Sequence, residues 1–244
     1  MECNLTRTMT GVNGLPVRVL RDTIRLTVHV FLIVAVPLAY VYMLVLRDLA
    51  TQPASTTSIP ALKGGFAYLI VLLPLMMMNR FIVRPFSGGG LFLFNAMYDF
   101  VVPGAVGFLL YLLFVRDVRG RSPDERFLTL SSFFAGLFTL AGILDLFVRA
   151  EYHGAYELFL VPALRITMVL LVPTLYYHYS CGTYWVRYVH LVLMTATPFA
   201  LGIVPLLASM NLWWVAVSAT VVLFLVAWAA SLLSIGGVRA LRFR

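Results

Sequence analysis

Five polar or charged residues interrupt three apolar stretches of the sequence, and their types define the chemistry available to the chain. Asn95 and Asp99 lie four residues apart in one stretch, Asp145 lies near the end of the next, and Glu157 and Arg165 lie in a third. At membrane depth an ionisable group costs at least about 2.5 kcal/mol, so it normally faces the interior of a helix bundle and pairs. Such groups can bind a polar or ionic solute or couple an ion, or they can fix the register of two helices.

The composition shows why these residues have to be considered in a membrane. Of the 244 residues, 61% are hydrophobic and 11% are charged. Soluble domains have about 45–50% apolar and about 25% charged residues. A soluble fold of this length could not cover so much apolar surface with polar groups, so we expect lipid to be the solvent for most side chains.

A spanning helix needs about 20 predominantly apolar residues. We therefore predict one all-α, polytopic membrane domain over residues 1–244, with about seven transmembrane helices. Six or eight helices are the alternatives, for example if the glycine-rich region at residues 87–91 is re-entrant. The loops are short, and the longest covers residues 50–63. The predicted spans are residues 26–46, 65–83, 91–115, 127–148, 155–177, 189–210 and 212–235.

The predicted helices place Asp99 and Arg165 at a similar depth. If the third helix enters the membrane at Leu91, Asp99 lies about 12 Å along it, at 1.5 Å per residue. If the fifth helix enters from the same side at Ala155, Arg165 lies about 15 Å along it. We therefore predict that the Asp99 carboxylate supplies the counter-charge of Arg165, with Glu157 contributing less directly.

The remaining polar residues extend this pair into a predicted crevice. Asn95 shares a helix face with Asp99. Asp145 and Glu157 approach from the same side at a depth of roughly 6 Å or less. We predict that Asn95, Asp99, Asp145, Glu157 and Arg165 line a ligand site in which Arg165 holds an anionic group. The alternatives are that Asp145 and Glu157 extend to the lipid headgroups, and that Asp99 and Arg165 form a purely structural pair.

The net charge of +8 comes almost wholly from arginine, because Lys63 is the only lysine. The arginines cluster at the ends of apolar runs, which indicates anionic headgroups rather than nucleic acid as their partners. The distribution over all loops favours a cytoplasmic carboxyl terminus in the cell membrane. Arg18, Arg21 and Arg25, directly before the first predicted span, argue for the reverse orientation.

The sequence offers little for catalysis. The four histidines and two cysteines form no pattern typical of a zinc or haem site, so we expect no metal, no cofactor and no catalytic residues. The leading interpretation is a protein that binds or permeates a small polar or ionic solute. One alternative is a non-catalytic subunit or sensor that docks other membrane proteins. The other is a membrane-embedded lipid-modifying enzyme that uses His178, Cys181 or the carboxylates.

Overall fold

The computed structural model describes residues 57–82, 88–115, 122–148 and 160–242, together with residues 27, 28 and 31. Within these ranges the elements form six helices, of which the second is divided into α4, η3 and α5. The elements are α3 (Ser58–Phe81), α4 (Gly88–Ala96), η3 (Met97–Val101), α5 (Val102–Phe114), α6 (Pro123–Val148), α7 (Val161–Cys181), α8 (Tyr184–Ser209) and α9 (Trp213–Arg242).

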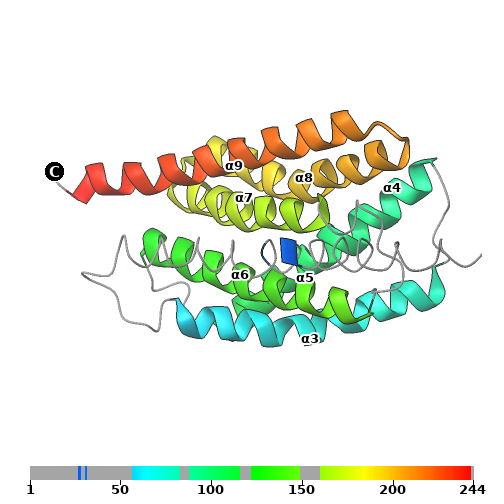
Figure 1. The fold of residues 1–244 in the computed structure, drawn as a ribbon. Coiled ribbons are helices and arrows are strands. Elements are labelled where there is room, and N and C mark those ends of the chain that lie inside the picture. The colour runs from blue at the N-terminus through cyan, green and yellow to red at the C-terminus, as the bar shows by residue number, and fades with distance from the viewer. Residues whose placement is uncertain are drawn as a thin grey trace, which may run out of the picture.

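Helix α7 lies at the centre of this arrangement. It packs against α6 on one side and against α8 and α9 on the other, while α3 packs along α6. Figure 1 shows α7, α8 and α9 side by side in one layer, with α6 and α3 below them, and α4 rising from the lower part toward α8. The polar residues that α7 carries are therefore held by helices from both layers.

The central helix α7 is buried, whereas the outer helix α9 is largely exposed. From Val161 to Leu175 every residue of α7 except Ala163 and Leu171 is buried. In contrast, only 22% of the apolar window of α9 is buried inside the protein. Helix α9 exposes a face of valines and leucines. Exposure of this much apolar surface to water would cost free energy, because apolar side chains are stabilised by leaving water. An exposed face of this kind fits a lipid surrounding.

Among the described residues, five helices are long and apolar enough to cross a membrane, and the chain is a multi-pass membrane protein. They correspond to five of the seven predicted spans. Helix α7 (Val161–Cys181) overlaps the predicted span 155–177 but is not one of the five. The predicted span 26–46 lies outside the described residues apart from three positions. The five helices are Ser58–Phe81, Gly89–Phe114, Pro123–Asp145, Tyr184–Ser209 and Trp213–Ser234.

The helix that contains the second predicted span is longer than that span, which was predicted to start at residue 65. Helix α3 already begins at Ser58, so the end of the predicted loop 50–63 is helical. Pro60 is tolerated because it stands in the first turn, where an N–H has no intrahelical acceptor. The Lys63 ammonium donates to the Phe114 carbonyl at the end of α5, 2.9 Å away. A cation is stabilised at a helix carboxyl terminus, which explains how Lys63 fits within a helix.

Two glycines allow α3 and α6 to approach each other closely. A Cβ at Gly64 would collide with the Phe133 carbonyl, and a Cβ at Gly136 would collide with the Ala61 carbonyl. Small residues at such crossings let backbones pack against each other in membranes, where association depends on van der Waals contact. This contact fixes α6, and with it Asp145, against α3.

Candidate functional site

Asp99 lies in a local widening of its helix, and Pro103 explains why. Proline has no N–H, so in a regular α-helix Pro103 would leave the Asp99 carbonyl four residues earlier without its partner and would crowd it. The chain instead forms the π-helical segment η3, in which the Val102 N–H bonds to the Met97 carbonyl five residues back. Such single-turn π segments are frequent at functional positions.

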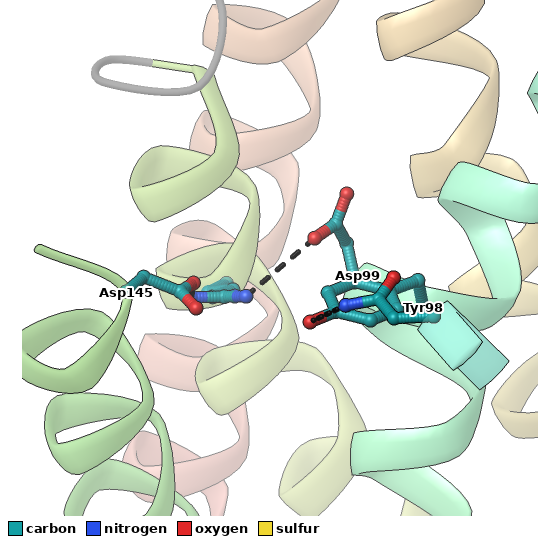
Figure 2. Close-up of polar contacts among 5 residues, drawn as sticks. Tyr98, Asp99 and Asp145 are labelled. Atoms are coloured by element: carbon teal, nitrogen blue, oxygen red, sulfur yellow. Dashed lines mark hydrogen bonds and ion pairs between the residues drawn. The ribbon is translucent and has the colours of Figure 1, made fainter. Parts of the chain in front are cut away.

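Arg165 lies in the first turns of α7 and is 4% exposed. Its guanidinium donates to the Asp145 carboxylate of α6 across 2.7 Å. It also forms an ion pair with Asp99 of η3, in which the nearest nitrogen and oxygen are 3.6 Å apart. Figure 2 shows Asp145 and Asp99 arriving from different helices, with a dashed line from Asp99 to the guanidinium. One cation therefore joins three helical segments.

The structure brings together three of the five predicted site residues. Asp99 and Arg165 form the ion pair that was predicted. Asn95, four residues before Asp99, is 3% exposed. Glu157 lies outside the described residues.

Asp145 was predicted near the membrane surface, yet it is the shorter ion-pair partner of Arg165. The reason is geometric. Asp145 lies three residues before the end of α6, and Arg165 lies four residues after the start of α7 at Val161. These positions are about 5 Å and about 6 Å from adjacent helix ends, so the two side chains are level. The predicted depth of Arg165 assumed a helix start at residue 155, which lies outside the described residues.

Further polar side chains surround the ion-pair centre. Tyr68 of α3 is 1% exposed and lies near Arg165. The Asn79 amide donates to the Tyr98 hydroxyl across 3.1 Å, which joins the end of α3 to η3 directly beside Asp99. Figure 2 shows Tyr98 next to Asp99. Sequence reasoning missed the two tyrosines, because a tyrosine in an apolar stretch is more often an interfacial anchor.

The electrostatics of the centre depend on pairing. Charges this well buried are tolerated only when partners compensate for the lost hydration, and removing one partner of a buried pair typically costs about 3–5 kcal/mol. Arg165 also carries an Nε–H donor that finds no acceptor among the residues the structure describes. The guanidinium is thus held by two carboxylates while one of its donors is available for another acceptor.

No family model, curated protein or solved structure matches the chain significantly.

In the part of the chain that the structure describes, no group of three or more His, Cys, Asp or Glu side chains could hold a metal ion.

The carboxylates of the ion-pair centre lie far from His178, although all of them belong to the same bundle. Arg165 and His178 are thirteen residues apart on α7, which corresponds to about 20 Å. A catalytic arrangement that combines Asp99 or Asp145 with His178 would need hydrogen-bond reach between them. The Arg165 ion-pair centre and His178 therefore belong to separate parts of the bundle.

Proposed function

We propose that this chain binds a small solute with an anionic or other hydrogen-bond-accepting group at Arg165, as a binding or permeation protein of the cell membrane. The observation that carries the proposal is the state of the Arg165 side chain. It is 4% exposed, is shared between carboxylates of two other helical segments, and has a buried Nε–H without an acceptor among the described residues. An arginine presents several donors in a fixed plane, which suits a planar acceptor such as a carboxylate.

The two aspartates have different roles in this proposal. Asp145 contacts the guanidinium at 2.7 Å and acts as its anchor. The contact of Asp99 is 3.6 Å, longer than a hydrogen bond, and Asp99 belongs to the π-helical segment η3. Asp99 is therefore the partner that an incoming acceptor displaces. Its carboxylate competes with the solute for the same donors, so its charge sets the affinity.

Measurement of ligand-induced stabilisation tests this proposal. The purified protein in nanodiscs is titrated with acetate, lactate and succinate, and its melting temperature is followed, because a ligand that binds the native state stabilises it by an amount that grows with the ligand concentration relative to Kd. We expect at least one of these carboxylates to raise the melting temperature of the wild type. Arg165→Lys should abolish the response, because an ammonium lacks the planar donor set.

Two further variants separate a binding site from a structural ion pair. Asp99→Asn should strengthen the response by removing the competing charge. Glu125→Gln serves as the matched control, since it removes a carboxylate from the opposite end of α6. If no carboxylate stabilises the wild type, or if all variants respond alike, Arg165 has only a structural role and the proposal fails.

The orientation in the membrane is part of the same proposal, with the carboxyl terminus in the cytoplasm. Its basis is the distribution of arginine over the loops. A reporter fused to the carboxyl terminus that is active only in the cytoplasm should be active. An inactive reporter on an expressed fusion protein would reverse the orientation.

A further inference from the structure

A groove of about 610 Å³ opens between α7, α8 and α9, far along α7 from Arg165. Its volume lies within the range of about 300–1,000 Å³ that is usual for small-molecule sites. Along α7 the groove extends from Leu171 to Cys181, a distance of about 15 Å. These three helices pack side by side in the upper layer of Figure 1.

The lining of the groove changes from apolar to polar along its length. Leu171 and Leu175 of α7 line the part toward the centre of that helix. His178 follows one turn later and lies beside His190 of α8, with the ring centroids 5.2 Å apart. Beyond them the start of α8 exposes Trp185, at 78%, in a cluster of aromatic residues typical of a membrane–water interface. The polar end is therefore the end at the interface.

The hydrogen bonds of Ser234 determine the tautomer of His178. The Ser234 hydroxyl has one hydrogen, which it donates to the Ala230 carbonyl at 2.8 Å. When this hydrogen goes to the carbonyl, the 2.9 Å contact between Ser234 Oγ and His178 Nε2 uses a hydrogen on Nε2. In the neutral ring this leaves a lone pair on Nδ1 of His178. Because its hydrogen is directed away from the imidazole, Ser234 is not poised as a nucleophile.

The neutral His190 ring also has one unprotonated nitrogen, and the Val186 carbonyl determines which one it is. Its Nδ1 lies 2.7 Å from the Val186 carbonyl, which can only accept, so Nδ1 carries the hydrogen. The neutral ring therefore has its lone pair on Nε2. Both stacked rings line the groove, and in these tautomers the nitrogen of each ring that does not contact Ser234 or Val186 is an acceptor. A ligand that fits them must supply donors of its own.

We propose that this groove binds a single-chain lipid with a hydroxylated, uncharged headgroup, of which a monoacylglycerol is the simplest example. Its acyl chain lies over Leu171, Leu175 and Leu233, and its hydroxyls donate to the acceptor nitrogens of His178 and His190. The site is separate from Arg165 and does not depend on the function proposed there. Lipid is the expected occupant because the exposed rim residue Leu233, at 76%, faces the surroundings of a multi-pass membrane protein.

Photolabelling tests this assignment. The probe is a monoacylglycerol with a diazirine and an alkyne in its acyl chain, added to the purified full-length protein in nanodiscs at pH 7.5. Labelled peptides are mapped by mass spectrometry. We expect the label on α7 and α9 beside the groove. Excess unlabelled monoacylglycerol should compete, whereas its dimethyl ether, which has the same chain without hydroxyl donors, and the ionised fatty acid should compete poorly.

Three variants make the test specific. Ala230→Phe fills the groove and should abolish the competed labelling. Leu233→Trp also fills the groove, and should also abolish the competed labelling. Because Leu233 is exposed, this variant still tests the proposal if Ala230→Phe fails to fold. His190→Phe keeps a ring but removes an acceptor, and should weaken competition by about 3- to 10-fold, the usual value of one hydrogen bond.

Leu225→Phe is the matched control, because Leu225 lies on the same helix, is 56% exposed and does not line the groove. It should label as the wild type does. Equal competition by the dimethyl ether, or labelling spread evenly over the exposed faces of α8 and α9, would mean ordinary surrounding lipid and would overturn the proposal. Unchanged labelling in both Ala230→Phe and Leu233→Trp would also overturn it.

Discussion

The two ends of α7 carry polar groups in opposite environments. Near its amino-terminal end, Arg165 is enclosed between α6 and η3 and is paired with two carboxylates. Near its carboxyl-terminal end, His178 lies in an open groove and contacts the neutral side chains of Ser234 and His190. The same helix thus holds charge where packing excludes lipid, and holds neutral hydrogen-bonding groups where it does not.

This difference follows from the cost of burial. A full charge in a low-dielectric interior requires an opposite charge at contact distance, so the helices around it must be fixed accurately. A neutral imidazole requires only a hydrogen-bond partner, which one neighbouring helix can supply. We therefore expect the Arg165 end to be important for stability and the groove end to tolerate substitution.

The largest expected effect comes from removing the cation. Arg165→Met leaves Asp99 and Asp145 close together without their shared partner, and should lower the free energy of unfolding by about 3–5 kcal/mol. The measurement is unfolding of the purified protein in mixed micelles. Arg187→Met, at an exposed arginine whose Nε donates to the Gly182 carbonyl between α7 and α8, should change the free energy by less than about 0.5 kcal/mol.

A triple variant checks the reason for this loss. Arg165→Met combined with Asp99→Asn and Asp145→Asn removes all three charges, and should recover much of the stability, since a buried ion pair can be replaced by neutral groups at little cost. If the triple variant is as unstable as Arg165→Met, loss of packing rather than uncompensated charge explains the effect.

The second prediction concerns the packing that positions Asp145. Gly64→Ala places a methyl group against the Phe133 backbone and should cost about 1–3 kcal/mol, as overpacking does. The neighbouring Gly65→Ala is its control, because a Cβ there meets the Gly136 carbonyl at 3.8 Å, an ordinary contact. Gly65→Ala should be neutral or stabilising, since alanine favours helix. Equal losses in both variants would show that α3 and α6 do not depend on this crossing.

The sequence was sufficient to predict the class of fold and one contact of the site. Long apolar stretches predict membrane helices, because each helix satisfies its own backbone hydrogen bonds in lipid. The pair of Asp99 and Arg165 was predicted by counting residues from expected helix starts at residues 91 and 155. The ion pair forms, but α7 begins at Val161, so the count from the helix ends does not by itself explain it.

Other features could not be predicted in this way. Asp145 was not paired with Arg165 because Arg165 was placed about 15 Å deep, from a predicted helix start at residue 155, and helix ends are the least certain part of a sequence-based prediction. The spacing of Asp99 and Pro103 did contain the signal for the π-helical segment, through the missing N–H. The meeting of His178, His190 and Ser234 depends on how three helices pack, which no local pattern specifies.

The smallest expected effect concerns the hydrogen bond of the groove. A double-mutant cycle with Ser234→Ala and His178→Phe should give a coupling energy of about 0.6 kcal/mol, the average for hydrogen bonds between membrane helices. The value is small because an unfolded chain in the membrane also finds hydrogen-bond partners for both side chains. The cycle is measured by unfolding in the same micelles as the Arg165 variants. A coupling energy near that of the Arg165 centre would mean that the groove is as rigidly specified as the ion-pair site, and the contrast between the two ends of α7 would have to be abandoned.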